Sequence, residues 1–324
     1  MNFEKTMEVN DSLCPTTDLD HAVALVEQFV KEQTSTSIEL LQCALKPILN
    51  NPGKQIRVQM LLLSADAIYG SNQKSIALAA IVQMIHYATL LHDDVIDEAD
   101  VRRNQPTVRK ILGNKTSILS GDYLYATAFR LISELKHHDL IAEIAEATGT
   151  ILAGEIKQWQ CQLNKTFDER LYQDIIAKKT ARLFELSTSI MCLSEPELKH
   201  FYPTLKMFGY HVGMAFQMID DTIDYASQSG KAIGMDFYEK KITLPVLKLL
   251  TKATENDQVI FHQCFGSDLK VMLQLLEKYD VFSACRRQAQ MHIDKACQGL
   301  DLLPNQTASD ALRDIIQKTI ERIH

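Results

Sequence analysis

The sequence of 324 residues predicts an all-α protein, and three of its features indicate this class. Gly and Pro are scarce, with 12 Gly and 8 Pro, about half of the roughly 12% that the two residues hold on average. No segment alternates β-branched and polar residues over the length of a strand. Apolar residues instead recur at helical spacing in long segments that short polar turns separate. Since 46% of the residues are hydrophobic, the chain can bury a large core.

The individual helices are predicted from caps, turns and apolar periodicity. Asp18 can cap the first helix, in which Val26 and Val30 are among the apolar positions, and a turn at residues 50–53 closes the first hairpin. Further helices are predicted over residues 57–68, 75–97, 115–135, 140–163, 168–193, 205–225 and 244–251, with two or three more beyond residue 266. We find no repeat of solenoid length, low-complexity tract or linker. We therefore expect a single domain over residues 18–324, after a flexible segment over residues 1–17.

Charge and cysteine usage exclude several classes of function. The net charge is -7 and no basic stripe is present, which argues against nucleic acid as a partner. The seven cysteines are scattered singly without a Cys-x-x-Cys pair, so neither a zinc site nor a disulfide framework is indicated. The N-terminus lacks the pattern of a signal peptide, and no apolar run reaches the ~18 residues of a membrane span. We expect a cytoplasmic protein with no transmembrane segment.

Two apolar helices are each predicted to end in a cluster of aspartates. The clusters have the same spacing and comprise Asp93, Asp94 and Asp97 in the first and Asp220, Asp221 and Asp224 in the second. Carboxylates are disfavoured at the negative C-terminal end of a helix, so they need a compensating cation there. Residues four apart share one helix face, so each cluster presents a pair of oxygen ligands.

Oxygen ligands without His or Cys suit a hard cation such as Mg²⁺, whose coordination water and substrate phosphate oxygens usually complete. The pattern thus indicates a diphosphate held by magnesium between two helices. One isolated cluster would fit a solvated helix end equally well. Two copies after two apolar helices favour the metal site.

The segments LLHDDVIDEADVRR and FQMIDDTIDY resemble the two aspartate-rich motifs of the trans-polyprenyl diphosphate synthases. Other segments match the family in order: GKQIR (53–57), GEIKQ (154–158), KTARLFE (179–185), SGKAIG (229–234) and KITLP (241–245). KTARLFE is most similar to the bacterial octaprenyl synthases, which make the ubiquinone tail. The resemblance implies a large helical bundle of the isoprenoid synthase type with a central cavity. It also implies head-to-tail condensation of isopentenyl diphosphate onto an allylic diphosphate such as farnesyl diphosphate.

Roles for individual residues follow from the resemblance alone. The implied ligands of Mg²⁺, with three ions when substrate is bound, are Asp93, Asp97, Asp220, Asp221 and Asp224. The implied partners of isopentenyl diphosphate are Lys54, Arg57, His86 and Arg103. The implied partners of the allylic diphosphate are Arg102, Lys179, Thr180, Gln217, Lys231 and Lys241. The residues expected to stabilise the departing diphosphate are Asp93, Asp94, Asp97, Arg102, Lys179 and Lys231.

Chain length is predicted from the helix before the first cluster. Thr89 and Ala88 precede Asp93 by four and five residues, so they lie roughly 6 to 7.5 Å below it on or near the same face. Aromatic residues close the pocket at these positions in the farnesyl synthases of the family. Small residues here imply that the growing tail passes, which predicts a long-chain product.

Departures from the family pattern leave the carboxylates intact. They are Pro52, where a second Gly is common, Gln55 for Arg, and Asn104 and Lys240, each for Gly. They affect loop geometry near the isopentenyl site. The family is usually homodimeric, and the apolar helices after Thr116 and Leu140 are candidates for the interface.

Several alternatives stay open or are disfavoured. A shorter-chain farnesyl or geranylgeranyl synthase and a non-catalytic subunit of a heteromeric synthase remain, although both aspartate motifs are intact. Terpene cyclases typically carry Asn, Ser or Thr, and Glu in their second motif. A di-iron protein needs paired Glu-x-x-His motifs. Glu134 with His137 and Glu197 with His200 match it formally, but neither pair projects from an apolar helix face.

Overall fold

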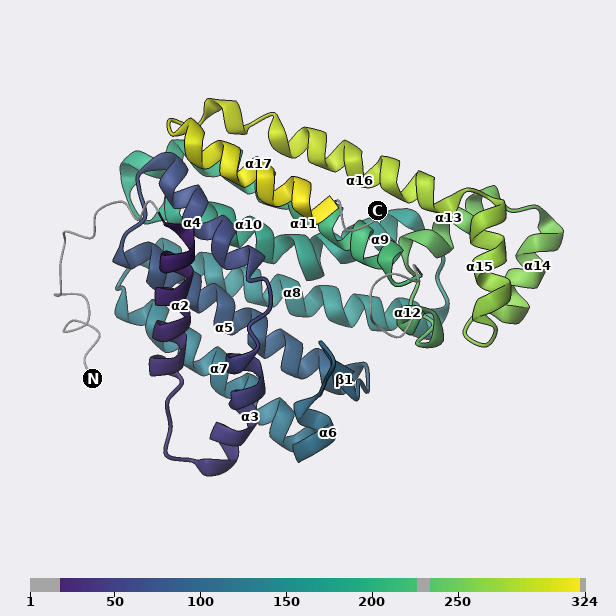
Figure 1. Cartoon of the computed structure of the whole chain (residues 1–324), viewed down its shortest axis with the longest axis horizontal. Helices are drawn as coiled ribbons and strands as arrows, with labels where there is room; N and C mark the ends of the chain where they lie inside the picture. Colours follow the sequence, from purple (N-terminus) through teal and green to yellow (C-terminus); the bar gives the residue numbers. More distant parts are fainter. Residues whose placement is uncertain (1–17, 226–233, 321–324) are drawn as a thin grey trace. The chain divides into compact units, whose positions relative to one another are not determined.

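The protein is described here by a computed structural model that covers residues 18–225 and 234–320 (Figure 1). These residues form two compact units. Unit 1 contains residues 18–148, 185–206 and 300–312, and unit 2 contains the described residues of 149–184, 207–299 and 313–320. Because each unit collects separate stretches of the chain, a single domain over residues 18–324 stays a prediction. The predicted flexible segment, residues 1–17, lies outside the described residues.

The predicted all-α class is confirmed. The first helices are α2 (Leu19–Gln33), α3 (Glu39–Asn50), α4 (Ile56–Ile68), α5 (Gln73–Ile96), α6 (Val108–Leu112), α7 (Asn114–Glu134) and α8 (His138–Asn164). The predicted cap is also confirmed, because the Asp18 carboxylate accepts hydrogen bonds from the backbone N–H groups of Asp20 and His21 at 3.0 and 3.4 Å. This cap satisfies two of the donors that a helix N-terminus leaves unpaired.

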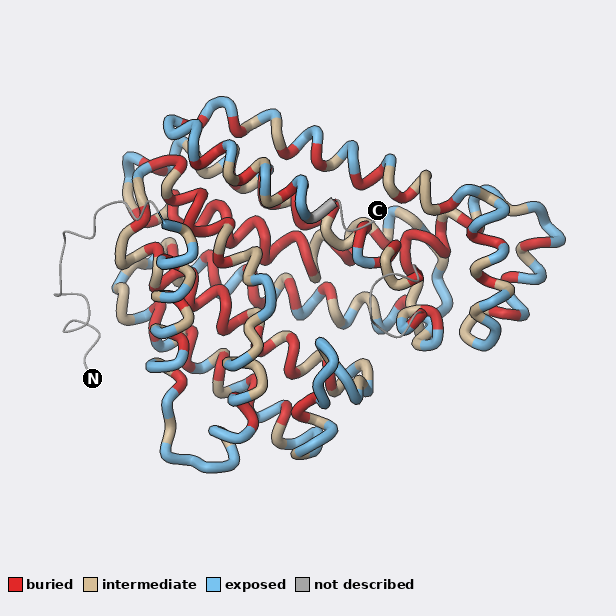
Figure 2. The backbone as a smooth tube through the Cα atoms, in the orientation of Figure 1, coloured by how far each residue is buried: buried red, intermediate tan, exposed pale blue. Residues whose placement is uncertain are grey.

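Helix α5 is the centre of unit 1 and is buried along most of its length (Figure 2). It packs against α2, α4 and α7. Its start is defined by a capping box, in which the side chains of Asn72 and Ser75 bond each other's backbone N–H groups. By length and composition α5 could also cross a membrane, but 72% of its most apolar window is buried inside the protein. Core packing therefore accounts for its apolar character, and the first aspartate cluster ends it.

A short β-hairpin that the sequence did not predict follows α5. Strands β1 (Val101–Arg102) and β2 (Gln105–Pro106) pair antiparallel. The two turn residues, Arg103 and Asn104, have φ of 51° and 60°, as the tight turns that fit the twist of a hairpin require. Two residues per strand are too few to show alternation. Asn104, and also Lys240 with φ of 56°, occupy positions where Gly is common in the family that the sequence resembles.

The remaining helical elements are α9 (Glu169–Ile176), the π-helical turn η1 (Ala177–Ala181), α10 (Arg182–Ser189), the 3₁₀ turns η2 (Ile190–Leu193) and η3 (Pro196–Phe201), α11 (Tyr202–Ile223), α12 (Met235–Tyr238), α13 (Leu244–Lys252), α14 (Glu255–Cys264), α15 (Leu269–Lys278), α16 (Val281–Cys297), the 3₁₀ turn η4 (Leu300–Leu302) and α17 (Gln306–Ile320). The helix predicted over residues 168–193 is thus interrupted by the π-turn. Helix α14 was not predicted, because its sequence, ENDQVIFHQC, has only a weak apolar face.

Candidate active site

The first aspartate cluster lies at the C-terminal end of α5, where its three members have different surroundings. Asp94 is 4% exposed, and its Oδ1 accepts a hydrogen bond from Nε of Arg102 at 2.6 Å. Burial raises the pKa of Asp94, and the charge of Arg102 opposes that rise. Asp93 and Asp97, one helical turn apart, are partly exposed. The pair that the sequence predicts as metal ligands is therefore accessible, and Asp94 is engaged by a guanidinium.

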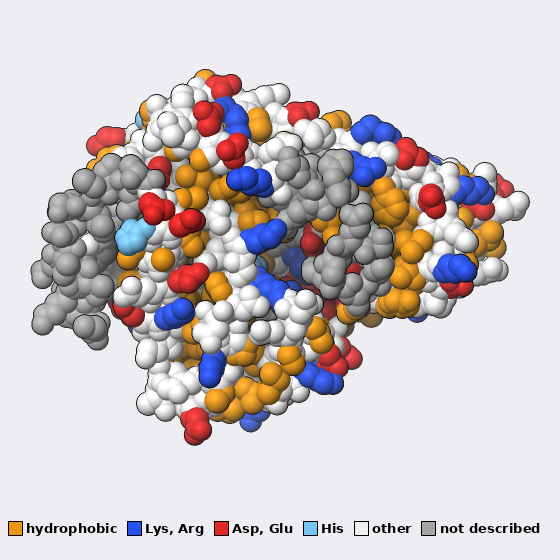
Figure 3. All heavy atoms as spheres, viewed as in Figure 1, with side chains coloured by type: hydrophobic (Ala, Val, Ile, Leu, Met, Phe, Trp, Pro, Cys, Tyr) orange, Lys and Arg blue, Asp and Glu red, His pale blue; other side chains and the backbone are white. Residues whose placement is uncertain are grey.

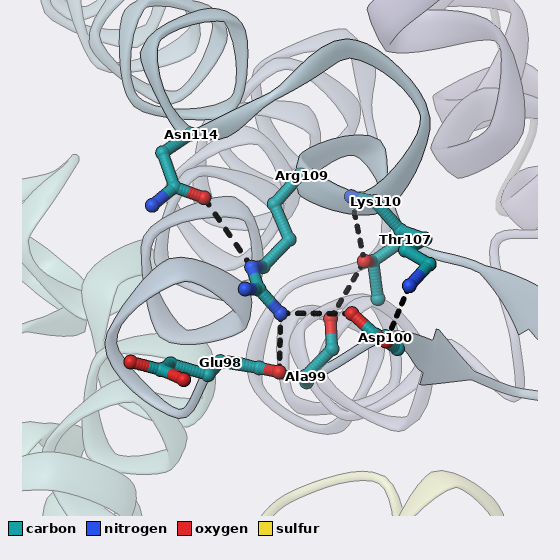
Figure 4. A network of polar contacts seen from close by, with 7 residues as sticks. All are labelled: Glu98, Ala99, Asp100, Thr107, Arg109, Lys110 and Asn114. Carbon is teal, nitrogen blue, oxygen red and sulfur yellow. Dashed lines mark hydrogen bonds and ion pairs between the residues drawn. The ribbon is translucent and has the colours of Figure 1, made fainter.

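The hairpin that bears Arg102 and Arg103 is anchored by the network drawn in Figure 4. The Arg109 guanidinium donates to the Glu98 carbonyl and, at 2.9 Å, to Oδ1 of Asp100. Nζ of Lys110 donates to Oδ2 of Asp100 at 2.7 Å. The Thr107 hydroxyl donates to the carbonyl of residue 99 at 2.7 Å. These bonds join residues 98–100, before the hairpin, to residues 107–110, after it, so they hold the base of the hairpin closed.

Three predicted diphosphate-binding arginines of unit 1 lie close enough to His86 for their charges to act on it. Burial lowers the pKa of His86 well below its usual value, and the charges of Arg57, Arg103 and Arg102 lower it further. The Arg103 guanidinium also donates to the Asn51 carbonyl at 2.7 Å, which connects the hairpin to the loop before α4. Like charges held close together repel each other, so the arrangement favours a bound anion.

The other predicted residues of unit 1 are also located. Lys54 is exposed in the loop before α4. Ala88 is fully buried. Thr89 is partly exposed, and its hydroxyl donates to the His86 carbonyl at 2.8 Å. The route of a growing prenyl tail past Ala88 stays a prediction.

The second cluster ends α11 in unit 2. Asp220 is exposed, Asp221 is 3% exposed and Asp224 is partly exposed. The Asp224 carboxylate accepts hydrogen bonds from the backbone N–H groups of Met235 and Asp236 at 3.2 and 3.1 Å. Burial, followed by the charge of Asp236, raises the pKa of both Asp221 and Asp224 to about 7. A bound cation would offset the cost of burying these carboxylates.

Asp221 accepts hydrogen bonds from two side chains and one backbone N–H group. Its Oδ2 accepts from the Tyr172 hydroxyl at 2.7 Å and from the Leu244 N–H at 3.2 Å. Its Oδ1 accepts from Nε2 of Gln217 at 2.8 Å. The hydroxyl of Thr180 in turn donates to Oε1 of Gln217 at 2.7 Å. Two of the predicted allylic residues, Thr180 and Gln217, are thus brought together with this aspartate.

The predicted lysines of unit 2 are paired with acids. Nζ of Lys179 lies 2.5 Å from Oε2 of Glu155 and donates to Oε1 of Gln158 at 2.8 Å. Lys241 lies 2.6 Å from a carboxylate oxygen of Glu239 and 3.4 Å from one of Asp236. These partners keep the two cations in place. Lys231 lies outside the described residues.

The donor set fits a hard cation. Among the residues that the structure describes, no three His, Cys, Asp or Glu side chains are grouped closely enough to hold a metal ion alone. Mg²⁺ commonly takes one or two carboxylates and completes its shell with water and substrate phosphate oxygens. The paired carboxylates of each cluster match this demand. The Glu-x-x-His pairs of a di-iron centre do not form such a group in the described ranges.

Three residues of this region were not assigned a role from the sequence. Glu155 and Gln158 lie three residues apart in GEIKQ. This spacing places both on one helix face, which was the signal that could have identified them as joint partners of one residue. Tyr172 had no such signal, since 49 residues separate it from Asp221.

Lys and Arg are interspersed with Asp and Glu on the face in Figure 3. With a net charge of -7, attraction of a polyanion depends on local cations such as Arg57, Arg103 and Lys179.

The family model and two similar curated proteins indicate the same family. Residues 38–279 match the family model described as polyprenyl synthetase. The all-trans-nonaprenyl-diphosphate synthase (geranyl-diphosphate specific) of Rhodobacter capsulatus is 35% identical over 310 residues, covering 93% of this chain and 94% of that protein. The octaprenyl diphosphate synthase of Escherichia coli K12 is 32% identical over 333 residues and covers 99% of both chains.

Solved structures agree with the sequence comparison. A decaprenyl diphosphate synthase from Rhodobacter capsulatus superposes with a TM-score of 0.88 at 31% identity, covering 94% of this chain and 97% of that one. The polyprenyl synthase from Caulobacter crescentus CB15, complexed with calcium and isoprenyl diphosphate, has a TM-score of 0.88 at 27% identity, covering 93% and 94%. That second protein was thus solved with a divalent cation and a prenyl diphosphate.

Proposed function

Because the chain belongs to the polyprenyl synthetase family of prenyltransferases, we propose that it is a magnesium-dependent, long-chain trans-polyprenyl diphosphate synthase. Its substrates would be isopentenyl diphosphate and an allylic diphosphate such as farnesyl diphosphate. The observation that carries the proposal is the pair of aspartate clusters. In each cluster, two partly or fully exposed carboxylates lie one helical turn apart, at the C-terminal end of a helix whose residues are mostly buried.

The residues divide the work in the proposed reaction. When bound, Mg²⁺ supplies positive charge to the departing diphosphate and orients it. Arg102, Lys179 and Lys231 are proposed to donate charge-assisted hydrogen bonds to phosphate oxygens of the allylic substrate. Asp94 holds Arg102 for this task through the 2.6 Å bond.

The second substrate is proposed to bind the cationic group of unit 1. Arg57 and Arg103 can each bind two phosphate oxygens, and His86 is kept neutral, so it can donate one ring N–H without adding charge. Lys54 adds an exposed ammonium. The proton that leaves after condensation is proposed to go to the released diphosphate, since the sequence pattern marks no carboxylate or His as a dedicated base.

A long product, octaprenyl for a quinone side chain, is the finer proposal. Ala88 and Thr89 support it because they are small at the level where the tail would pass. Proteins of 35% and 32% identity named as nonaprenyl and octaprenyl synthases also favour it. A short-chain isoprenyl diphosphate synthase of Methanothermobacter thermautotrophicus is 30% identical, so chain length has to be measured.

A cytoplasmic homodimer is proposed as the working form. Helix α8 exposes four large apolar side chains with spacings of four, three and four residues: Leu152 (44%), Ile156 (65%), Trp159 (58%) and Leu163 (65%). That spacing is the seam of a helix pair. A contiguous apolar stripe on a helix favours a partner surface.

The decisive experiment is a product assay with the purified chain, farnesyl diphosphate and labelled isopentenyl diphosphate. We expect incorporation that Mg²⁺ supports and excess chelator abolishes, with a product of about forty carbons by mass spectrometry. No incorporation at any metal concentration would overturn the enzymatic proposal. A product that stops at fifteen or twenty carbons would overturn the long-chain proposal alone.

A further inference from the structure

We propose that Tyr172 is a positioning residue for the allylic site, and that Asp221 acts as its hydrogen-bond acceptor and not as a metal ligand. The inference deepens the proposed function and rests on it. It divides the second aspartate cluster into a metal-binding pair, Asp220 and Asp224, and a buried anchor, Asp221.

A continuous hydrogen-bond chain supports this assignment. The Tyr172 hydroxyl on α9 donates to Asp221 on α11 at 2.7 Å. Gln217, one turn earlier on α11, donates to the other oxygen of Asp221 at 2.8 Å. Thr180 of the π-turn donates to Gln217 at 2.7 Å. The chain therefore runs from Tyr172 to the two residues that the sequence assigns to the allylic diphosphate.

The burial of Asp221 separates it from its neighbours in the cluster. It is 3% exposed, and both of its oxygens accept hydrogen bonds from protein donors. Mg²⁺ demands near-octahedral geometry and retains several waters. Oδ2 of Asp221 already accepts two hydrogen bonds and Oδ1 accepts one, so a cation with its waters would have to compete with Gln217 for the space around Oδ1. Asp220 is exposed and Asp224 is partly exposed. Asp224 accepts only from the backbone N–H groups of Met235 and Asp236 in the hydrogen bonds described above, and it shares a helix face with Asp220. The difference between Asp221 and this pair is therefore its burial against the side chains of Tyr172 and Gln217.

Asp221 also determines which way the Gln217 amide points. A carboxylate only accepts, so the NH₂ group of Gln217 faces Asp221 and its oxygen faces Thr180. The Thr180 hydroxyl must then donate to Gln217. Without the Tyr172 hydroxyl, the Asp221 carboxylate could shift, and the Gln217 amide and the Thr180 hydroxyl would shift with it.

The π-turn is held against its neighbours closely enough to transmit such a shift. A Cβ on Gly213 of α11 would lie 2.4 Å from Cα of Ala181, and a Cβ on Gly154 of α8 would lie 2.7 Å from the Lys179 nitrogen. Both glycines thus permit backbone contacts that any side chain would block. Single π-turns inside helices are frequent at functional sites, and this one bears Lys179 and Thr180 side by side.

The first test is kinetic and uses Tyr172→Phe with Tyr279→Phe as the matched control. The Tyr279 hydroxyl also donates to a carboxylate, that of Asp257, and this bond joins the end of α15 to α14. We expect Tyr172→Phe to lower kcat/KM for the allylic substrate about tenfold, the scale of one hydrogen bond to a charged group. The KM for isopentenyl diphosphate should change less than about twofold, and Tyr279→Phe should leave both unchanged.

A double-mutant cycle with Thr180→Val distinguishes positioning from general destabilisation. If the chain acts as one unit, the double variant is no slower than the slower single variant. If Tyr172 has only a structural role, Tyr172→Phe lowers the thermal stability and leaves the KM for the allylic substrate unchanged. The loss of rate in the double variant is then the product of the losses in Tyr172→Phe and Thr180→Val. That result would overturn the proposal. If Tyr172→Phe proved poorly folded, the metal titration of Asp221→Asn below would still test whether Asp221 is a hydrogen-bond acceptor and not a ligand.

The second test measures metal binding without turnover, by titrating Mn²⁺ into protein with inorganic diphosphate and following free Mn²⁺ by its paramagnetic resonance. We expect Asp221→Asn to retain wild-type Mn²⁺ affinity within about twofold and Asp224→Asn to weaken it about tenfold or more. Equal losses would make Asp221 a ligand and overturn the proposal. If wild-type and Tyr279→Phe proteins form no product at all, the proposed function fails. If both are active and Tyr172→Phe matches them, this inference fails alone.

Discussion

The aspartates of the first cluster differ in what holds them, although the sequence places them within five residues. Asp94 is paired with Arg102, whereas Asp93 and Asp97 stand one turn apart and partly exposed. We therefore expect Asp93→Ala and Asp97→Ala to lower turnover by several orders of magnitude, because a lost metal ligand costs far more than an ordinary hydrogen bond of ~1 kcal/mol. Steady-state assays at saturating Mg²⁺, with circular dichroism as the folding control, measure this. A folded variant with more than about a tenth of wild-type turnover would refute the metal role.

A histidine pair in unit 2 predicts an acid-sensitive fold. Nδ1 of His211 on α11 lies 2.9 Å from Nδ1 of His292 on α16. Burial, and then the charges of His211 and Lys295, lower the pKa of His292 to about 4; burial and Lys295 also lower the pKa of His211. Both imidazoles are thus neutral in the folded protein at neutral pH. In the unfolded chain they take up protons below pH ~6.5.

The direction in which pH changes the free energy of unfolding follows from this proton uptake. The unfolded state binds more protons between pH ~6.5 and ~4, so the stability present above pH 6.5 is lost as pH falls through that window. Allowing for partial exposure, the loss from this pair is about 1 to 2 kcal/mol. Urea unfolding at a series of pH values measures it. His292→Gln should flatten the dependence within the window, and an unchanged slope would contradict the assignment.

Among the elements, α5 links the first aspartate cluster to the predicted chain-length control. Ala88 is fully buried at the level one turn below Asp93. Ala88→Phe should place a ring across the path of the tail and shorten the product to about fifteen or twenty carbons, while the first condensation continues. Mass spectra of the products decide the outcome. An unchanged long product from folded, active Ala88→Phe protein would mean that the tail runs elsewhere, and the control Ala88→Val should give an intermediate effect.

The end of α8 predicts a stabilising substitution. Lys165 follows the last helical residue with φ of 49°, and the N–H of Thr166 bonds the Cys161 carbonyl at 3.1 Å. This is the helix end at which glycine is favoured. Lys165 is exposed, so Lys165→Gly should raise the free energy of unfolding by about 0.5 to 1 kcal/mol.

Lys165→Ala is the matched variant, because it removes the same side chain but keeps the Cβ that strains a positive φ. It should give no such gain in denaturant unfolding. If the Ala and Gly variants were equally stable, the gain would come from lost charge and not from backbone strain.

For the whole molecule, the apolar stripe of α8 predicts a dimer whose dissociation can be followed through one fluorophore. Trp159 is the single tryptophan of the chain, and it is 58% exposed in the isolated chain. Dilution should therefore shift its emission to longer wavelength as the dimer dissociates. Ile156→Glu should weaken the dimer at least about a hundredfold, because it buries an unpaired charge in the interface.

Sedimentation velocity gives the mass independently, and Val259→Glu is the matched control. Val259 on α14 is 56% exposed but belongs to no comparable stripe, so this variant should sediment like the wild type. A wild-type monomer at micromolar concentration would refute the dimer. Binding to phospholipid vesicles by the monomer would then identify a membrane as the occupant of the stripe.

The sequence by itself determined the features that depend on neighbours along the chain. Helical periodicity and caps such as Asp18 predicted most helices, because their bonds join residues four apart. The two aspartate clusters were visible because both members of each pair lie on one helical turn. Matched motifs in a conserved order then indicated the family.

Only the tertiary structure decided which of these residues have partners distant in the chain. The bonds from Tyr172 to Asp221, from Arg102 to Asp94 and from Lys179 to Glu155 form when separate segments pack together. The hairpin at residues 101–106 and the π-turn at residues 177–181 were not predicted from the sequence, because each is too short for a repeating pattern of apolar residues to show. Local spacing therefore grouped the carboxylates, and packing determined that Asp94 and Asp221 are buried while the other four are partly or fully exposed.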